Sequence, residues 1–438
     1  MTEPLAAADV AHWVDPASVF AAVFQQEPHC FWLDAGPDSR EGWSWIGAGA
    51  PADPAHVRAT TCSGAPAHGD GSPFRGGWVG WAGYDEAAAR AGAPASGEAD
   101  GVAQDLWLRV ERLVAFDHAG KTVRVYAPAA AVDDLAMAVA ASTTSAALPS
   151  HVQDHRVARA RHRADAYAAL IERCRDAIRE GDAYQLCLTT RFEVAASVDP
   201  VEVYARLRAA TPAHHGGFVR SGGTALLSAS PERFLHVEGA PDGGAVVRTR
   251  PIKGTRPRGA DPASDAALAA ELRASEKERA ENVMIVDLMR NDLSRVCVDG
   301  TVGVDALLEV ESYPAVHQLV STVSGRLVAG TTVDDLLAAT FPAGSMTGAP
   351  KLSAMRILHD LEGAPRGVFS GCFGWVGDDG ALDLAMVIRS IVVRPDSAYV
   401  GAGGGITWRS DAAAEVAEVG IKARGPLAAL GAELPPGW

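Results

Sequence analysis

The sequence predicts an α+β protein rather than a doubly wound α/β protein. Short β-like runs rich in Gly, Pro and Trp fill the first 150 residues. After them, helical and strand-like segments mix without the regular βαβ alternation of a parallel sheet. Hydrophobic residues make up 48% of the 438 residues, which is enough for a large core. No internal repeat with a period of 20–50 residues is present, which excludes solenoid and propeller folds.

In the first 150 residues, the runs WSWIGAGAP (43–51) and PFRGGWVGWAGYD (73–85) are typical of strands and turns. Residues 109–126 predict a hairpin around His118-Ala119-Gly120. An acidic start at Asp133-Asp134 favours a helix within the Ala/Ser-rich stretch 129–149. The basic run at 151–163 is interpreted as a solvated linker, with a docking patch as the alternative.

The later part predicts longer elements. Residues 164–180 have apolar side chains at helical spacing, and Gly181 supplies a C-terminal stop. Residues 263–293 predict one long helix. Shorter helices are expected at 354–361 and 412–430. Strands are expected at 183–194, 217–219, 225–228, 234–237, 368–376, 385–393 and 397–402.

Composition excludes several classes of function. The net charge of −15 argues against nucleic-acid binding and against anionic membranes. No apolar run reaches the roughly 18–20 residues of a membrane span, and the first residues do not resemble a signal peptide. The six cysteines are widely spaced, without a CxxC pair, which argues against disulfides and zinc. We therefore expect a reducing, cytoplasmic location.

Two pairs of glutamates are spaced three residues apart in helical segments. Glu278 and Glu281 form one pair, and Glu415 and Glu418 form the other. At this spacing both members share one helix face. If the two faces meet, four carboxylates supply the hard oxygen ligands that Mg²⁺ prefers. The alternative for each pair is an ordinary solvated surface.

Two Gly-rich segments are candidate anion sites. GAGGGI, which contains Gly403, Gly404 and Gly405, precedes a helix with Lys422 and could offer backbone N–H groups to an anion. A tight turn is the alternative. GSMTGAPK (344–351) lacks the GxxxxGK[ST] spacing of a nucleotide-binding loop, so we reject nucleotide binding there.

Three single residues are candidates for acid–base or covalent chemistry. Lys253 lies among arginines in RTRPIKGTRPRG, and neighbouring cations and partial burial would both lower its pKa and make it a nucleophile. A basic loop that binds a carboxylate is the alternative. Glu232 and His317 stand in apolar surroundings, which predicts either an acid or base with a shifted pKa or a satisfied, half-buried side chain.

Together these segments resemble the chorismate-utilising enzymes, which include anthranilate synthase component I, aminodeoxychorismate synthase component I and the isochorismate and salicylate synthases. The motifs occur in the family's order across roughly 270 residues. They are GDAYQLCLTTRF, SASPERF, PIKGTRPRG, RAENVMIVDLMRNDLSRV, ESYPAVHQLVSTVSG, FPAGSMTGAPK, LAMVIRS and GAGGGITWRSD. The resemblance implies large β-sheets packed in a sandwich with helices outside, in which an N-terminal region (1–150) interleaves with a chorismate-binding catalytic domain (164–430).

The resemblance also implies roles for the candidate residues. Glu281 and Glu418 are implied as Mg²⁺ ligands, with Glu278 and Glu415 acting directly or through water. Glu232 is implied as the acid that protonates the departing C4 hydroxyl of chorismate. The implied substrate-binding or cavity-lining groups are Thr255, His317, Thr347, Arg389, Lys422 and the amides of Gly403, Gly404 and Gly405.

Two positions sort the members of the family. Gln185 stands where the water-using enzymes carry a lysine, which implies ammonia as the nucleophile. PIKGTR, with Lys253, resembles the aminodeoxychorismate synthases, where this lysine is implied to add to C2 before ammonia adds at C4. Anthranilate synthase component I or a secondary-metabolism relative is the alternative, and a non-catalytic regulatory subunit is a minor one. Cys187 and Phe369 depart from the family's usual Asn and Tyr or Trp.

The ammonia is implied to come from a separate glutamine amidotransferase subunit, because no GxCxGxQ-like segment is present. The product is implied to feed 4-aminobenzoate and folate synthesis. An N-terminal pocket can hold tryptophan in this family, but residues 31–44 match neither ligand-binding pattern, so no ligand is assigned there.

Overall fold

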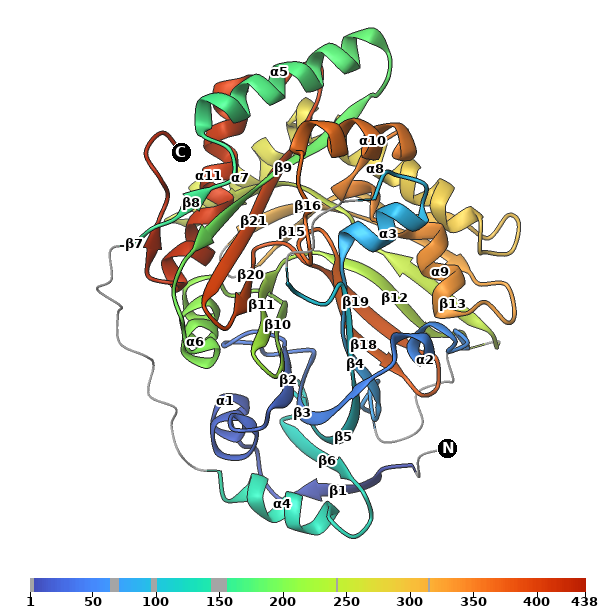
Figure 1. The fold of residues 1–438 in the computed structure, drawn as a ribbon. Helices are drawn as coiled ribbons and strands as arrows, with labels where there is room; N and C mark the ends of the chain where they lie inside the picture. Colours follow the sequence, from blue (N-terminus) through green and yellow to red (C-terminus); the bar gives the residue numbers. More distant parts are fainter. Residues whose placement is uncertain (1–3, 64–70, 96–100, 143–155, 242, 314–315) are drawn as a thin grey trace.

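The computed structural model describes residues 4–63, 71–95, 101–142, 156–241, 243–313 and 316–438 (Figure 1). Its strands form a continuous antiparallel network that divides at β5 (Asp105–Asp117). One edge of β5 pairs with β3 (Trp43–Ala52). The other edge pairs with β4 (Gly77–Ala82) and then with β6 (Thr122–Ala127), so two arms leave the same strand.

The first arm continues from β3 through strands of both halves of the chain. In order they are β2 (His29–Asp34), β10 (His215–Ser221), β11 (Thr224–Ser230), β20 (Ser390–Arg394), β21 (Ser397–Ile406) and β9 (Gln185–Val194). Three short strands extend the edges of the network: β1 (Ala6–Val10) on β6, and β8 (Arg159–Ala160) and β17 (Gly348–Ala349) on β9.

The second arm continues from β4. Its strands are β18 (Cys372–Gly377), β19 (Leu382–Met386), β12 (Arg233–Gly239), β13 (Ala245–Thr249) and β16 (Val316–Arg326), and β16 also pairs with β14 (Ile252–Pro257) and β15 (Gly303–Ser312). Apart from both arms, β7 (Arg156–Val157) pairs in parallel with β22 (Ala432–Glu433).

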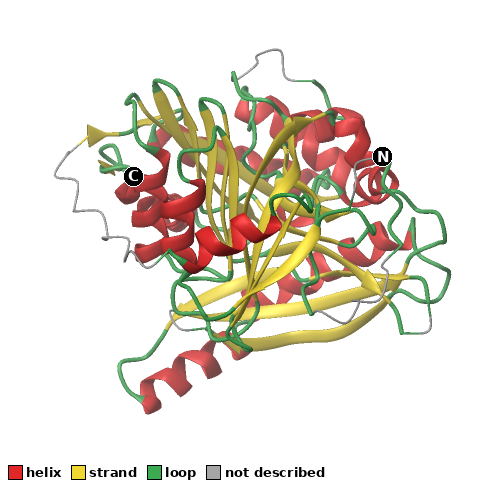
Figure 2. Ribbon diagram, turned by 90° about the horizontal axis from the view of Figure 1, so that it is seen from below, coloured by secondary structure: helices red, strands yellow, loops and turns green. Residues whose placement is uncertain are grey.

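The two arms pack face to face. One buried cluster joins Leu226 and Val392 of the first arm to Val79 and Phe373 of the second. Neighbouring residues of the same strands point to the opposite face, as in any sheet, and there they meet helices. Figure 2 shows the strands inside and helices at the periphery. The predicted α+β sandwich with helices outside is confirmed.

The helices divide between the two outer faces. The first arm is covered by α5 (Ala164–Glu180), α6 (Pro200–Ala210), α10 (Lys351–Glu362), α11 (Ala412–Ala429) and the short α1 (Pro16–Val19) and η1 (Phe20–Phe24), while α4 (Val132–Ala140) packs on β1 and β6. The second arm is covered by α2 (Pro54–Arg58), α7 (Pro262–Ala274), α8 (Glu276–Ser294), α9 (Val333–Thr340) and the turn η2 (Gly344–Met346), and α3 (Tyr84–Arg90) follows β4. None of the helices in the described residues is long and apolar enough to cross a membrane.

Several predicted elements are confirmed. The hairpin is β5 and β6, and the helix 164–180 ends at Gly181, whose φ of 89° only glycine adopts without strain. The helix in 129–149 is shorter than that stretch, because α4 ends at Ala140 and residues 143–155 lie outside the described part. Of the predicted linker 151–163, residues 156–163 are described, and they include the short strands Arg156–Val157 and Arg159–Ala160, so this part is not a free connector.

Two predicted elements are wrong because backbone conformation interrupts them. The single helix 263–293 is two helices, since Ser275 is extended (φ −63°, ψ 109°) and caps α8. The single strand 385–393 is β19 and β20, since Arg389 has a φ of 52° between them. The strand expected at 368–376 begins only at Cys372.

Candidate active site

The candidate residues come from the far ends of both arms. Lys253 lies on β14, Glu232 lies just before β12, and Gln185 opens β9. The glutamate pairs lie on α8, which packs against β14 and β16, and on α11, which packs along β21. The charges of Glu281, Glu232 and Glu418 all act on the Lys253 ammonium, so residues 186 positions apart in sequence share one site.

Lys253 lies among carboxylates, which overturns the prediction that neighbouring cations lower its pKa. Burial does lower the pKa, but Glu281, Glu232 and Glu418 raise it by more, so the net shift is upward. Each nearby arginine has a carboxylate partner instead: Arg248 with Glu238, Arg250 with Glu311, Arg256 with Glu271 and Arg258 with Asp265. Among the described residues, the Lys253 amine has neither a hydrogen-bond nor an ion-pair partner, so it is available to a ligand.

Glu232 is a buried carboxyl group with a raised pKa. Burial raises the pKa to about 7, while Lys253 and a hydrogen bond from Ser345 act in the opposite direction. The Ser345 hydroxyl donates to Glu232 Oε1 over 3.0 Å. A carboxyl group with this pKa is partly protonated at neutral pH, which is the state that a general acid requires.

Glu281 carries the clearest sign of a missing ligand. Its side chain is only 8% exposed, and its Oε1 atom is buried without a hydrogen-bond partner. Burial raises the pKa of Glu281, Lys253 and Lys277 lower it, and Glu278 and Glu415 raise it further. The carboxylates of α8 and α11 therefore face one another closely enough to repel.

Lysines balance part of this negative charge. Lys422 Nζ lies 2.8 Å from Glu418 and donates to the Gly403 carbonyl over 2.9 Å. Burial raises the pKa of Glu418, but Lys422 and the other lysines lower it by more. Lys277 lies 3.4 Å from buried Glu415, which also accepts a hydrogen bond from Ser410 over 2.7 Å.

These carboxylates fit a magnesium ion in their chemistry. In the described part of the chain, no three His, Cys, Asp or Glu side chains already converge on one point. Nevertheless, an unpartnered buried carboxylate oxygen on Glu281, with further carboxylates facing it, is a hard and anionic donor set. Glu281 and Glu418, supported by Glu278 and Glu415, would hold the ion.

The glycine segment is part of a strand rather than a loop, which corrects the prediction for GAGGGI. Gly403, Gly404 and Gly405 belong to β21 and pair with Thr189, Leu188 and Cys187 of β9. The Thr189 amide donates to Glu362 and the Cys187 amide to the Thr347 carbonyl. Because antiparallel bonding alternates, the amides of Gly403 and Gly405 point away from β9 and that of Gly404 points toward it.

Gln185 lies directly against Gly405. A Cβ atom on Gly405 would clash with the Gln185 amide nitrogen and would lie 3.8 Å from Glu281 Oε2. Gln185 is 1% exposed, and its Oε1 atom has no hydrogen-bond partner. Two unpartnered oxygens, on Gln185 and Glu281, therefore lie on the same side of β21.

The remaining predicted residues are Arg389, Thr347, Thr255 and His317. Arg389 is partly buried, its guanidinium has no partner among the described side chains, and burial lowers its pKa while Glu418 opposes this. Thr347 is buried, and its hydroxyl donates to the Ala343 carbonyl over 3.2 Å. Thr255 is exposed on β14, opposite Gln318. Both nitrogens of His317 are occupied, by Ser312 at 2.8 Å and Asp265 at 2.9 Å.

Residues missed from the sequence include Ser345, Lys277 and Arg366. Ser345 lies in FPAGSMTGAPK, and only the fold brings it to Glu232, 113 residues away. Lys277 directly precedes Glu278 in the sequence, and this position beside a predicted metal ligand was the signal that could have identified it. Lys351, tested as a phosphate-loop lysine, instead lies 2.6 Å from Asp292.

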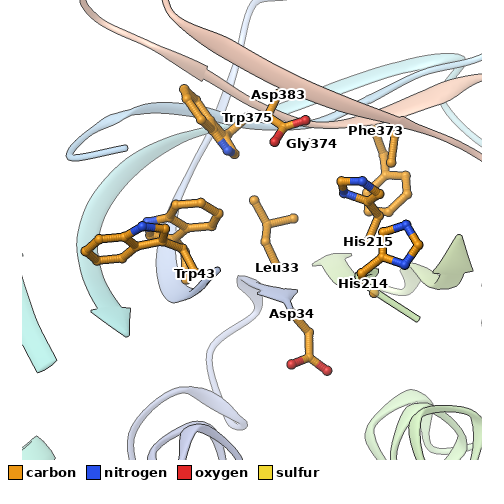
Figure 3. A pocket seen from close by; sticks show the side chains of 12 residues that line it. Leu33, Asp34, Trp43, His214, His215, Phe373, Gly374, Trp375 and Asp383 are labelled. Atoms are coloured by element: carbon orange, nitrogen blue, oxygen red, sulfur yellow. The ribbon is translucent and has the colours of Figure 1, made fainter. Parts of the chain in front are cut away.

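A separate cavity of about 50 Å³ lies between strands of the two arms (Figure 3). Trp43 and Trp375 line one side, and Phe373, His214 and His215 line the other. Its lining includes none of the predicted catalytic, substrate-binding or metal-binding residues.

The fold is an α+β sandwich, and its two arms contribute an acidic site that contains Lys253. The chain belongs to the chorismate binding enzyme family, whose model matches residues 17–428.

Curated relatives carry two different names. The chain is 39% identical over 470 aligned residues to an aminodeoxychorismate synthase of Streptomyces pristinaespiralis, covering 96% of this chain and 64% of that protein. It covers 38% of a second aminodeoxychorismate synthase, from Streptomyces griseus, at 45% identity. It is also 40% identical to the anthranilate synthase component 1 of Thermus thermophilus, covering 83% of this chain and 79% of that one. The chain thus spans less than two thirds of these aminodeoxychorismate synthases.

Solved structures share the fold. Anthranilate synthase component I from Streptococcus pneumoniae matches with a TM-score of 0.73 at 28% identity, over 97% of this chain and 92% of that one. The menaquinone-specific isochorismate synthase of Escherichia coli matches with a TM-score of 0.74 at 18% identity, over 98% and 96% of the two chains.

Proposed function

We propose that the chain is an aminodeoxychorismate synthase component I, a transaminase-type transferase that replaces the C4 hydroxyl of chorismate with ammonia and gives 4-amino-4-deoxychorismate. The observation that carries the proposal is Lys253, whose amine has no partner in the described residues and lies near the buried acid Glu232. Family membership and the similarity to aminodeoxychorismate synthases support it.

The chemistry balances with these two residues. The neutral Lys253 amine adds to C2, the two conjugated ring double bonds shift to C1=C6 and C4=C5, and the C4–O bond breaks as Glu232 donates its proton to the leaving water. Ammonia then adds at C4, both ring double bonds return to C1=C2 and C5=C6, and the C2–N bond breaks so that its electron pair returns to Lys253. The Glu232 carboxylate takes a proton from the new ammonium group, which resets the acid.

Other residues bind and orient the substrate. Arg389 and the amides of Gly403 and Gly405 offer donors for the carboxylates of chorismate. Thr347, whose hydroxyl donates to the Ala343 carbonyl, would line the same site. Glu281 and Glu418 would hold a divalent cation, whose positive charge would favour the anionic substrate and offset the carboxylates that raise the pKa of Lys253. Gln185 is the first residue of β9. Its side-chain amide is uncharged and therefore does not activate water.

The ammonia source lies outside this reaction centre. All six cysteines are buried, which leaves no accessible thiol for attack on glutamine within these residues. We infer a separate glutamine amidotransferase partner and 4-aminobenzoate for folate as the use of the product. A cytoplasmic location is consistent with six free thiols.

Product identification tests the proposal. The chain is incubated with chorismate, Mg²⁺ and ammonium, and the products are separated and identified by mass. We expect 4-amino-4-deoxychorismate, turnover with ammonium but not with glutamine alone, and no anthranilate fluorescence. Anthranilate formed without a lyase would refute the proposal in favour of the second candidate, anthranilate synthase component I, which the relatives with that name support.

Lys253→Ala tests the covalent step. We expect loss of amination at C4, whereas the matched change Lys121→Ala, on the distant β5–β6 turn, leaves the rate unchanged. Full rate and unchanged product in Lys253→Ala would contradict covalent catalysis by this lysine.

A further inference from the structure

Arg366, in the loop after α10, uses its whole buried guanidinium to hold other parts of the chain. Its side chain is 1% exposed and forms a two-point ion pair with Glu362, from Nε over 2.8 Å and from Nη2 over 2.7 Å. Nη1 donates to the Met346 carbonyl over 2.6 Å, and Nη2 donates to the Cys187 carbonyl over 2.9 Å. Only arginine has enough donors in a fixed fork to make these bonds together.

The bonds end on the backbone next to predicted site residues. Glu362 Oε1 also accepts the Thr189 amide over 2.9 Å, so the ion pair holds β9 at two alternate residues. Met346 directly precedes Thr347, whose carbonyl accepts the Cys187 amide over 2.8 Å. The strand that begins with Gln185 and the segment that carries Thr347 are therefore fixed to each other through one ion pair.

The N-terminal third of the chain supports this ion pair from the other side. The carboxylate of Asp85 accepts the amides of Arg366 over 3.1 Å and Gly367 over 2.7 Å. The guanidinium of Arg366 stacks on Tyr84, 4.3 Å from the ring centre. Both supporting residues belong to α3, which packs on α10 through Tyr84 and Met355 (Figure 1).

We propose that Arg366 and Glu362 are positioning residues for the active site, and that Tyr84 and Asp85 set the position of this pair. They touch no predicted reacting atom, so they act by holding β9 and the Met346–Thr347 segment at the spacing that chorismate needs. When a mutation far from the reacting atoms misplaces the substrate by about 1 Å, the rate falls on the order of 100-fold. The proposal rests on the proposed function only in that this site binds and converts chorismate.

The test compares Arg366→Lys with Arg208→Lys. Arg208 of α6 is a matched control, because it donates to Asp34 over 2.6 Å and stacks on Trp32 of β2, rather than on β9 or the Met346–Thr347 segment. The melting temperature, the Kd values for Mg²⁺ and for chorismate, and the KM and kcat for chorismate consumption are measured for each. Consumption is followed whatever product forms, so a wrong product refutes the proposed function without affecting this comparison.

We expect Arg366→Lys to reduce kcat on the order of 100-fold and to weaken chorismate binding about tenfold, while Mg²⁺ binding to α8 and α11 stays within twofold. Arg208→Lys lowers the melting temperature but keeps the kinetic constants. Equal kinetic losses in both variants, or unchanged chorismate binding and kcat in Arg366→Lys, would overturn the proposal.

Asp85→Asn provides a gentler second variant if Arg366→Lys fails to fold. The substituted side chain keeps one oxygen that can accept a backbone amide, but it lacks the second carboxylate oxygen and the negative charge. We expect folded protein with a kcat reduced threefold to tenfold and an unchanged Kd for Mg²⁺. Wild-type kcat in folded Asp85→Asn would refute the support from the N-terminal third.

Discussion

Replacement of Ser345 by alanine should move the pH dependence of catalysis in a calculable direction. The Ser345 hydroxyl donates to Glu232 Oε1 over 3.0 Å and favours the ionised carboxylate, which lowers its pKa against the larger effect of burial. A hydrogen bond to a charged group stabilises it by roughly 1.5–3 kcal/mol, and about 1.4 kcal/mol corresponds to one pKa unit. Ser345→Ala should therefore raise the pKa of Glu232 above about 7 by roughly one to two units.

The pH profile of kcat/KM for chorismate consumption measures this shift. Because Glu232 acts as an acid, the wild-type rate should fall above pH 7, and the falling limb of Ser345→Ala should begin one to two pH units higher. Ser353→Ala is the control, because the half-buried Ser353 of α10 donates to the Asp182 carbonyl and not to Glu232, and its profile should match the wild type. An unchanged limb, or one moved to lower pH, would refute the assignment of Glu232 as the acid.

Three further predictions concern the same site. Glu232→Gln should lower turnover by roughly 10²–10⁴-fold. It should also raise the free energy of unfolding by about 3 kcal/mol at pH 8 but leave it unchanged near pH 4, because the raised pKa of Glu232 costs stability as the pH rises from 4.5 to about 7. Denaturant titration at both pH values measures this difference. Glu281→Gln should weaken Mg²⁺ binding at least tenfold, as measured by calorimetry. The control Glu276→Gln, at an exposed position of the same helix, should leave the affinity unchanged. Equal Mg²⁺ affinities in the two variants would contradict the metal assignment. Gly405→Ala should destabilise the fold by roughly 1–3 kcal/mol through its clash with Gln185, whereas Gly303→Ala, with open space around it, should not; equal melting temperatures would count against the packing of Gln185.

Local sequence signals predicted those parts of the fold that depend on neighbouring residues. Gly181 stops α5, and the His118-Ala119-Gly120 turn joins β5 and β6. The same signals failed where single backbone angles decide, as at Ser275, which divides a helix, and at Arg389, which divides a strand. Neither change leaves a mark in hydrophobic periodicity, because both residues stand between segments of the predicted type.

For the site, the sequence revealed which residue types are present but not which groups surround them in the fold. The sequence placed Lys253 among arginines, and those arginines are adjacent only along the chain, since antiparallel neighbours and helices give each one a carboxylate. The groups that act on Lys253 are Glu232, Glu281 and Glu418, which no spacing rule connects. A pKa depends on distances in space, so its direction could not follow from sequence order.

The sequence by itself determined the family motifs, the α+β class and the chemical inventory: four paired glutamates, one lysine, one acid and a glycine-rich segment. Only the tertiary structure decided that the glycines form the strand β21, that both His317 nitrogens are occupied, and that Arg366 joins the N-terminal third to β9. The physical reason is the same in each case. Periodicity and spacing describe contacts within one element, whereas burial, ion pairing and strand register depend on partners that folding brings from elsewhere in the chain.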